Sequence, residues 1–327
     1  MITQTPFQQS LTTLFHKDAN EGFYFEDQLT RTLPDLYKTI YAKGSAVKLV
    51  DYKSNVNPFG PGGYTSAMYY KLKPTGVANW TFSEVGDDLI NVDVVMDRER
   101  YSVHPFGAAI TFTDQNIREA QGQVFSVIEQ KREAALELMA QTSNQFAFFG
   151  RIPKDKGKQT HPDVWGLTNH PEFAVTDVSG ADANARKWIN KTGDQMVQDL
   201  FDAINKMKDL TNSNFNVNTI ALPMTQLSAL RQKRIGSNTD SAMDFFTKNY
   251  SDITLIEANE LKGAGVGNTD IFIAYERNPK HLWFEHSEIQ MSEIIKPNPG
   301  VYKMNMIAFS GGIIPPRPSS VLIYKGI

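Results

Sequence analysis

The chain ends in FSGGIIPPRPSSVLIYKGI (residues 309–327), and the structure of this stretch decides how the fold closes. Its centre, PPRP at residues 315–318, matches the P-x-x-P pattern of SH3 ligands. A recognition tail of that kind has polar, disordered flanks, whereas residues 313–314 and 321–324 are apolar. Proline belongs at strand edges and bends. The sequence therefore predicts a kink between two strands, with a last strand that closes the fold.

Length and composition indicate a globular protein. The 327 residues are 41% hydrophobic and 21% charged, enough for one large domain or two to three smaller ones. The net charge of −3 lacks the basic excess of a dedicated nucleic-acid-binding protein. The absence of cysteine excludes disulfides, thiolate metal sites and cysteine nucleophiles. The first residues do not resemble a signal peptide, and no apolar run approaches the roughly 18 residues that span a bilayer.

The N-terminal third is predicted to contain an arm and a long hairpin. Residues 1–43 are polar and aromatic without a sustained period, which is typical of an arm. Residues 45–113 are predicted as strands, beginning with SAVKLVDYK (45–53) and followed by the turn cluster NPFGPGGY (57–64). One later stretch shows the alternation of a half-buried strand: Ile90, Val92, Val94 and Met96. An isolated two-stranded hairpin is marginally stable, so we expect this one to lie on another surface.

Residues 114–149 change to a helical period. The apolar positions recur every three or four residues: Ile117, Ala120, Val124, Val127, Ile128, Ala135, Leu138 and Phe146. Asp114 is the expected N-cap, and Gly122 is expected to divide the region into a short helix and a long one. Gly150 and Pro153 are expected to end the long helix.

The middle of the chain predicts an inserted α/β region. It begins after a loop whose basic cluster, residues 151–158, is either simply solvated or in weak contact with a polyanion. Residues 182–210 are predicted as one amphipathic helix with this apolar stripe: Trp188, Met196, Leu200, Ala203 and Met207. Strands and short helices then alternate up to residue 276. We expect the long helix and the final strands to share one core, with this region inserted between them.

Candidate ligand-binding motifs have ordinary explanations. KGAGVG (262–267) does not have the dinucleotide-binding spacing, and a predicted strand follows it, so a flexible loop is favoured over a phosphate cradle. Among the six histidines, His281 and His286 are five residues apart and are expected on opposite faces of a strand. We therefore expect no cofactor and no metal site.

Candidate catalytic groups are equally sparse. The carboxylate pairs Asp87-Asp88 and Glu257/Glu260 are close in sequence, and neighbours in sequence rarely converge on one bond. No serine-hydrolase, zinc-protease or P-loop motif is present. We expect no catalytic residue and a protein that is not an enzyme, although a scattered active site stays open as an alternative.

The order of these segments, together with several short motifs, resembles the major capsid proteins of tailed phages, whose fold is shared with encapsulin shells. The motifs that carry the resemblance are NQFAFFG (144–150), WGLTNHP (165–171), ALP (221–223), YERNP (275–279) and the closing stretch 300–327. The match covers residues 40 to 327. The basic loop after residue 150 departs from the family pattern because it is longer than expected there.

The resemblance implies an α+β fold of five parts. They are an N-terminal arm (1–44), an extended hairpin called the E-loop with flanking strands (45–105), a peripheral domain with a long spine helix (106–172), an axial α/β domain (173–280) and closing strands of the peripheral domain (281–327). It also implies that the arm and the E-loop reach onto neighbouring subunits, and that axial domains meet around five-fold and six-fold axes.

The function implied is structural. Many copies would form hexamers and pentamers of an icosahedral head around double-stranded DNA, assembled in the bacterial cytoplasm without a membrane. Scaffolding, portal and decoration proteins are the other implied partners. The chain starts at Met1 without a long charged helical region, so we expect a separate scaffolding protein or a leader outside this sequence.

Aromatic residues of the arm and the hairpin are the expected subunit-interface anchors, because large aromatic side chains dominate interface energy. They are Phe15, Phe23, Tyr24, Phe25, Phe59, Tyr64, Tyr69, Tyr70 and Trp80. Two alternatives stay open at this point: an encapsulin-like compartment that encloses enzymes, and a soluble enzyme with a scattered active site.

Overall fold

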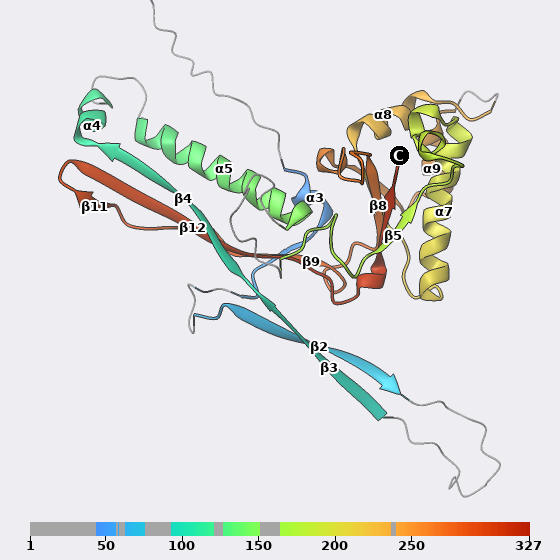
Figure 1. The fold of residues 1–327 in the computed structure, drawn as a ribbon, viewed down its shortest axis with the longest axis horizontal. Helices are drawn as coiled ribbons and strands as arrows, with labels where there is room; N and C mark the ends of the chain where they lie inside the picture. The colour runs from blue at the N-terminus through green and yellow to red at the C-terminus, as the bar shows by residue number, and fades with distance from the viewer. Residues whose placement is uncertain are drawn as a thin grey trace, which may run out of the picture. The chain divides into compact units, whose positions relative to one another are not determined.

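The computed structural model describes residues 44–56, 58, 63–75, 93–120, 127–150, 164–236 and 240–327, all within the larger of two compact units (Figure 1). The predicted arm, the residues around Gly122, the basic loop 151–158 and the Ile90–Val92 part of the alternating stretch lie outside the described residues.

Within the described residues, helices and strands follow the predicted order except at residues 46–49 and 182–192. The helices of this part of the chain are α3 (Ala46–Leu49), α4 (Asp114–Ala120), α5 (Val127–Phe149), α6 (Ala183–Arg186), α7 (Gly193–Thr211), α8 (Met224–Gln232) and α9 (Ala242–Asn249), with 3-10 turns η1 (Trp188–Asn190), η2 (Asn259–Leu261) and η3 (Pro318–Ser320). The strands are β1 (Tyr52–Lys53), β2 (Ser66–Thr75), β3 (Asp93–Ser102), β4 (His104–Thr113), β5 (Ala174–Asp177), β6 (Thr219–Leu222), β7 (Thr254–Glu257), β8 (Ile271–Tyr275), β9 (Trp283–His286), β10 (Gln290–Met291), β11 (Ile295–Asn298), β12 (Val301–Ile314) and β13 (Val321–Lys325).

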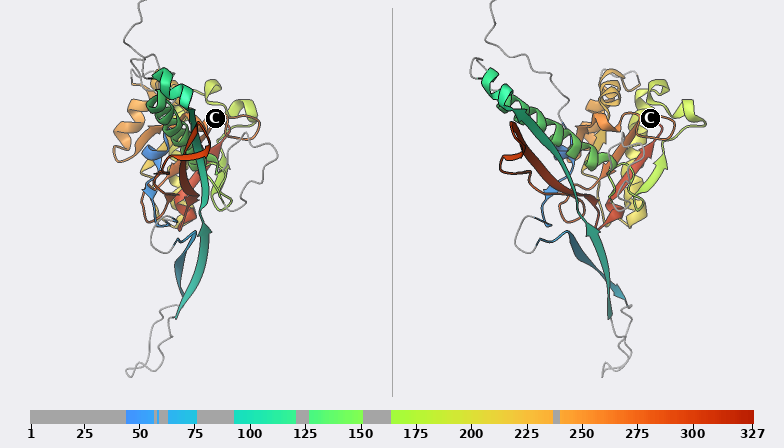
Figure 2. Two further views of the ribbon diagram at one scale, coloured as in Figure 1. Left: turned by 90° about the vertical axis from the view of Figure 1, so that its left-hand side faces the viewer. Right: turned by 60° about the vertical axis from the view of Figure 1, so that its left-hand side comes forward.

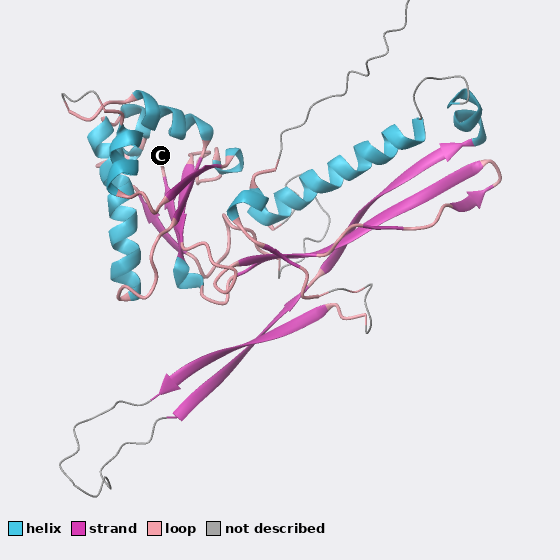
Figure 3. Cartoon of the chain, turned by 180° about the vertical axis from the view of Figure 1, so that it is seen from behind, coloured by secondary structure: helices cyan, strands magenta, loops and turns pink. Residues whose placement is uncertain are grey.

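Within the described residues these strands form three sheets. In the six-stranded sheet, β12 pairs with β4, β9, β10 and β11, and β1 adds to β9. The five-stranded sheet has the order β5-β13-β8-β6-β7. β2 and β3 pair with each other as a separate two-stranded hairpin (Figure 3).

The PPRP segment connects the two larger sheets. β12 ends at Ile314, η3 turns the chain, and β13 then enters the five-stranded sheet between β5 and β8. The predicted kink is confirmed. β13 joins the five-stranded sheet, but its Val321 and Ile323 pack in one cluster with Ala147 and Phe148 of α5, so the last strand and the long helix share a core as expected. The run VLIY of β13 is buried on both faces, which suits an interior strand of a sheet covered by helices.

Each large sheet carries its own helices. Ala135 and Met139 of α5 pack on Ile110 of β4 and Met306 of β12, so α5 lies along this strand pair (Figure 2). Helices α7, α8 and α9 pack on the five-stranded sheet. A third cluster joins the end of α5 to strands of both sheets, among them β8, β9 and β13.

The long helical region is divided as expected, with α4 and α5 as separate helices. The hydroxyl of Thr113, and not Asp114, caps α4 by accepting from the Asn116 amide (3.3 Å). Leu138, predicted on the buried stripe, is 49% exposed. The i+4 line of Ala135, Met139 and Ser143 faces the sheet instead, and Leu138 falls off that line.

The predicted strand 45–53 is a helix in its first half. The single turn α3 buries Ala46 and Leu49, which are three residues apart, and it contacts α5. The Ala46 amide donates to Oδ1 of Asn144 (2.9 Å), and Glu260 accepts from Asn144 and from Ser45. This long-range polar contact decides the local conformation, and it gives Glu260 a structural role.

The predicted helix 182–210 is broken. Asp182 caps α6, Trp188 lies in η1, and a Thr192–Gln195 capping box starts α7. The stripe Met196, Leu200, Ala203 and Met207 is confirmed on α7, but Trp188 is buried from the 3-10 turn and does not extend the stripe.

A substitution at Gly312 would test the close packing between β12 and the loop that follows α5. Its φ is +73°, and a Cβ there would lie 2.5 Å from the carbonyl oxygen of Trp165. We expect Gly312→Ala to lower the free energy of unfolding by about 2–4 kcal/mol, combining left-handed strain and overpacking. The measurement is the urea denaturation midpoint.

Gly267→Ala is the matched control, because Gly267 also has a positive φ (+70°) but nothing within 4 Å of its added Cβ. That variant should lose only about 1–2 kcal/mol. Equal losses in the two variants would show that the close approach to Trp165 does not constrain the fold.

Candidate functional site

The hairpin β2–β3 has two chemically different faces. Its strands pair without a register shift from Ser66↔Ser102 to Thr75↔Asp93, and no other described strand joins them. Opposed residues of an antiparallel pair share a face, and successive residues alternate. The even face carries Met68, Tyr70, Leu72, Val94, Met96, Arg98 and Arg100, and the odd face carries Tyr69, Lys71, Lys73, Val95, Asp97, Glu99 and Tyr101.

Charges on the odd face are paired within the hairpin. Lys71 Nζ lies 2.5 Å from Glu99, and Lys73 Nζ lies 2.5 Å from Asp97. The hydroxyl of Tyr69 also donates to Glu99. Both lysines of this face are therefore neutralised by carboxylates of the same hairpin.

The even face is apolar and uncovered. Met68 is 57% exposed, Leu72 61% and Met96 63%, and Tyr70 and Val94 are also exposed. The sequence predicted that Val94 and Met96 lie in a half-buried strand. In the single chain, Val94, Val95 and Met96 are all exposed, because no described helix or sheet covers this part of the hairpin.

The base of the hairpin is held by a buried carboxylate. Glu285 of β9 is 1% exposed and accepts from the Tyr101 hydroxyl (3.2 Å) and the indole N–H of Trp283 (3.0 Å). Burial, together with the charge of Glu285, raises the pKa of Tyr101. The ring of Tyr69 lies edge-on to Trp283, with centroids 6.2 Å apart. Two tyrosines of the odd face thus anchor the hairpin to β9.

Glu285 also holds the segment that precedes the hairpin. It accepts from the backbone amide of Val56 (2.8 Å) and from the side-chain amide of Asn55 (3.0 Å). No described basic side chain forms an ion pair with it, so four neutral donors surround one buried carboxylate. Such a group stays buried only while those donors are in place.

The nine predicted interface aromatics have different positions. Tyr64 and Tyr70 are exposed, whereas Tyr69 is partnered within its own chain. The other six, Phe15, Phe23, Tyr24, Phe25, Phe59 and Trp80, lie outside the described residues. Sequence reasoning missed the apolar partners Met68, Leu72 and Met96, the two arginines and Glu285. The alternation of residues along a strand could have predicted which hairpin residues share a face. No feature of the neighbouring sequence indicates the buried role of Glu285.

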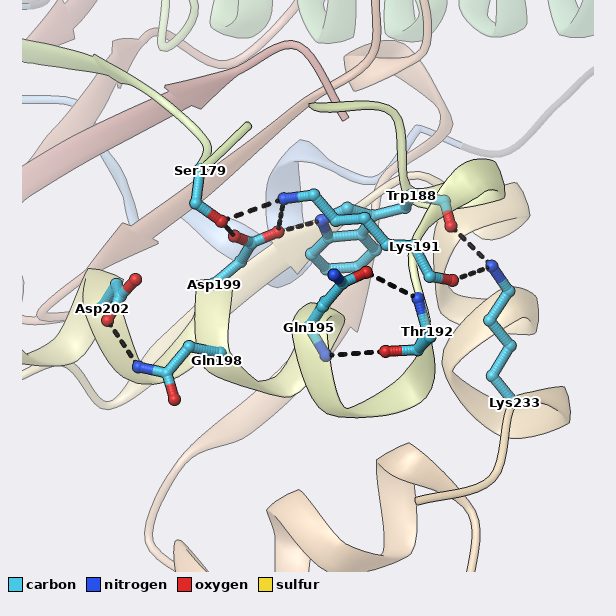
Figure 4. Close-up of polar contacts among 9 residues, drawn as sticks. All are labelled: Ser179, Trp188, Lys191, Thr192, Gln195, Gln198, Asp199, Asp202 and Lys233. Carbon is cyan, nitrogen blue, oxygen red and sulfur yellow. Dashed lines mark hydrogen bonds and ion pairs between the residues drawn. The ribbon is translucent and has the colours of Figure 1, made fainter. Parts of the chain in front are cut away.

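A second buried polar cluster lies under α7 (Figure 4). Asp199 accepts from Lys191 Nζ (2.6 Å), the indole N–H of Trp188 (2.8 Å) and the Ser179 hydroxyl (2.6 Å). The side chains of Lys191 and Asp199 are 4% and 0% exposed. These groups satisfy one another and leave no surface for a substrate, so the cluster fixes the 3-10 turn against α7.

The other candidate sites have structural roles. In the glycine-rich loop, the Gly263 amide donates to Asp270 Oδ1 (2.9 Å) and the Gly265 amide to the Thr269 carbonyl (2.8 Å), so neither is directed at a ligand. The loop borders a hollow of about 810 Å³ beside α8. His281 lies before β9 and contacts Arg317, whereas His286 lies within β9 and stacks on Tyr52.

The described residues contain neither a candidate metal centre nor a candidate membrane-spanning helix. No group of three or more His, Asp and Glu side chains is placed there to hold a metal ion. Among the helices of this part of the chain, none combines the length and the apolar character needed to cross a membrane.

Glu285→Gln tests the buried carboxylate. The amide keeps the size but brings its own donors toward groups that donate, so we expect the free energy of unfolding to fall by about 2–4 kcal/mol. Chemical denaturation measures it. Glu288→Gln, at an exposed position three residues later, is the matched control and should change stability by less than about 0.5 kcal/mol. A neutral result for both variants would contradict the anchoring role.

We expect the free energy of unfolding to depend on pH through His170, a histidine near the base of the hairpin. Its ring packs on Phe173, with centroids 4.7 Å apart, and burial, aided by the charge of Lys71, lowers its pKa from 6.5 to about 4. Below pH 6.5 the unfolded chain binds this proton first, so stability should fall as the pH drops from 6.5 to 4 and stay level above 6.5. Allowing for screening by water at this partly exposed ring, the loss should be about 1–2 kcal/mol.

The measurement compares the free energy of unfolding at pH 7 and pH 4.5 in the wild type and in His170→Asn. The variant lacks the titrating ring, so its loss on acidification should be smaller by that amount. Equal pH dependence in both proteins would rule out His170 as the source.

Comparison with known proteins gives one family and one fold. The family model described as "Major capsid protein" matches residues 76–327. The structure is similar to the capsid of Myoviridae phage XM1 (TM-score 0.74, 16% identity, covering 92% of this chain and 98% of that chain). It is also similar to a chain of Mycobacterium phage Che8 (TM-score 0.59, 11% identity, covering 91% of this chain and 96% of that chain). A third similar structure is the capsid of a native GTA particle (TM-score 0.58, 11% identity, covering 94% of this chain and 97% of that chain). No curated protein matches the chain.

These structural likenesses establish the mixed helix-and-sheet fold of phage capsid proteins, and the family match covers more than half of the sequence. The encapsulin-like alternative is not favoured by them. The chain therefore belongs to the major capsid protein family and is a structural protein of a phage head shell.

Proposed function

We propose that copies of this chain form hexamers and pentamers that build the icosahedral head of a tailed phage around double-stranded DNA. The even face of the hairpin is the observation that carries the proposal. Apolar side chains gather there without cover in a chain whose two large sheets are otherwise well packed. Contiguous exposed apolar surface of this kind marks an interaction site, and a lone two-stranded hairpin needs such a contact for stability.

A neighbouring copy is the partner that fits a shell. A hairpin of one subunit that covers a different surface of the next makes a heterologous contact, and such contacts close into rings when the rotation permits. The same logic extends to the five-stranded sheet and its helices, the axial domain of this proposal. Exposed apolar side chains there are Ile189, Met224 and Val266, which are suited to contacts around the ring axis.

The other proposed partners are DNA and the additional proteins that a phage head requires. The net charge of −3 suits a wall that encloses DNA without binding it tightly, since DNA has to enter and leave. A separate scaffolding protein, a portal and decoration proteins would complete the particle, and assembly would take place in the host cytoplasm. The proposal assigns no catalytic step to the chain, in keeping with a structural family.

Size is the first test. Sedimentation velocity and negative-stain microscopy of the purified protein near neutral pH should show megadalton rings or shells. Nuclease-resistant DNA inside native particles would distinguish a genome container from a compartment for proteins. A stable monomer or dimer at high concentration, even with crowding agents or a scaffold, would contradict the proposal.

The variant Met96→Asp tests whether assembly requires the even face of the hairpin. A charge on the even face should lower the assembled fraction at least tenfold, because burying an unpaired carboxylate in an apolar contact is costly. Sedimentation measures that fraction, and circular dichroism checks the fold. Val95→Asp places the same charge one residue away on the odd face and should assemble far better. Equal assembly of both variants would show that the even face is not the covered one.

A further inference from the structure

The PPRP segment contains one side chain whose position the kink does not explain. Arg317 lies between Pro316 and Pro318, and both prolines restrict the backbone around it. Its guanidinium Nη1 lies 2.9 Å from Nε2 of His281, which belongs to the connection from β8 to β9. The PPRP segment connects β12 to β13. The contact therefore joins two of the connections that lead from one large sheet to the other.

Backbone hydrogen bonds join the same two connections on either side of this contact. The Arg317 amide donates to the His281 carbonyl (3.4 Å), and the Glu276 amide donates to the Ser320 carbonyl (3.0 Å). The Ser320 hydroxyl in turn donates to the Arg317 carbonyl (2.7 Å). Arg317 thus holds His281 with both its backbone and its side chain. Of these hydrogen bonds, the one between the two side chains is the one that depends on a titrating ring.

That contact fixes the protonation state of His281. A guanidinium group offers donors and no acceptor, and it keeps its proton throughout the pH range in which proteins fold. His281 Nε2 must therefore accept, which requires a neutral ring that carries its hydrogen on Nδ1. Nδ1 lies 3.4 Å from Oε1 of Glu276. A protonated ring would direct a second donor and a second positive charge at Arg317, so the two side chains would separate.

The surroundings of His281 favour the neutral ring. Its side chain is 8% exposed, and the Phe215 ring lies edge-on to it, with centroids 5.1 Å apart. Burial lowers the pKa of His281 below the ordinary value of 6.5. The charge of Glu276, at the end of β8, opposes this shift, whereas the charges of Arg317 and Lys280 add to it. The ring is therefore neutral at pH 7, and the contact with Arg317 is intact.

We propose that Arg317 and neutral His281 form an acid-sensitive clamp that fixes the β8–β9 and β12–β13 connections against each other. Above pH 6.5 His281 accepts from Arg317 and the clamp is closed. As the pH falls below 6.5, protonation of His281 releases the exposed Arg317 side chain into solvent, and the stabilisation that the clamp provides is lost. The clamp lies within one chain, so the inference goes beyond the proposed function and does not depend on how copies assemble.

Hydrogen exchange measured by mass spectrometry tests the clamp in the full chain, assembled or not. The probes are peptides that cover residues 276–283 and 315–320, with protection corrected for the intrinsic effect of pH on exchange. Between pH 7.5 and pH 4.5 the wild type should lose protection in both peptides by at least about fivefold, which corresponds to one net hydrogen bond. Peptides from β4 are the internal reference and should change less.

Two variants separate the titration of His281 from the packing around it. His281→Gln offers an amide oxygen at about the reach of Nε2 and does not titrate, so it should keep its protection at both pH values. Arg317→Ala, at an exposed position, should already have the lowered protection at pH 7.5 and change little on acidification. His170→Asn removes a different histidine and is the matched control, because it should lose protection in these peptides as the wild type does.

Each outcome decides for or against the clamp. Protection that is independent of pH in the wild type, or an equal loss on acidification in His281→Gln, would overturn it. If circular dichroism shows that His281→Gln does not fold, Arg317→Ala decides, because wild-type protection in that variant at pH 7.5 would also overturn the clamp. Loss in the wild type, none in His281→Gln and an existing loss in Arg317→Ala would establish it. Shell assembly is measured separately by sedimentation, so a failure of the proposed function would be distinguished.

Discussion

The pairing of β12 with β4 is the constraint on which the rest of the structure depends. It runs over ten residue pairs, from Val301↔Thr113 to Ser310↔His104. One face of this pair carries α5. β4 follows β3 with only Val103 between them, so the strand that anchors the core continues directly from the second strand of the hairpin. At its other end, β12 leads through η3 into the five-stranded sheet. One long strand pair therefore connects the helix, the hairpin and the α/β region.

A single buried carboxylate makes that connection specific. Glu285 collects donors from the hairpin, from β9 and from the segment 55–56, which are distant in sequence. An apolar cluster could hold the same segments together, but it would allow them to slide. Four directional hydrogen bonds to one buried acceptor pair allow fewer arrangements, since any displaced donor would be left unsatisfied away from water. The hairpin base is thus fixed although the hairpin itself pairs with no third described strand.

The division of the hairpin into two faces is what connects fold with function. The odd face satisfies its own charges and uses Tyr69 and Tyr101 to hold the chain. The even face is mostly apolar, and its Arg98 and Arg100 form no ion pair with a carboxylate of the described residues. The odd face holds the hairpin to its own chain, and in the proposed assembly a second copy would cover the even face.

The sequence by itself determined most of the elements. The spacing of apolar residues and the positions of glycine and proline predicted α5, the stripe of α7 and the kink at residues 315–318, because these depend on neighbours in the chain. Only the tertiary structure decided that residues 46–49 form a helical turn, that the chain breaks before Thr192 and that β13 enters the five-stranded sheet. It also decided which hairpin face is covered. Alternation shows that a strand has two faces, but which of them is buried depends on partners far away in sequence, such as Trp283 and Glu285, and local propensity does not encode those contacts.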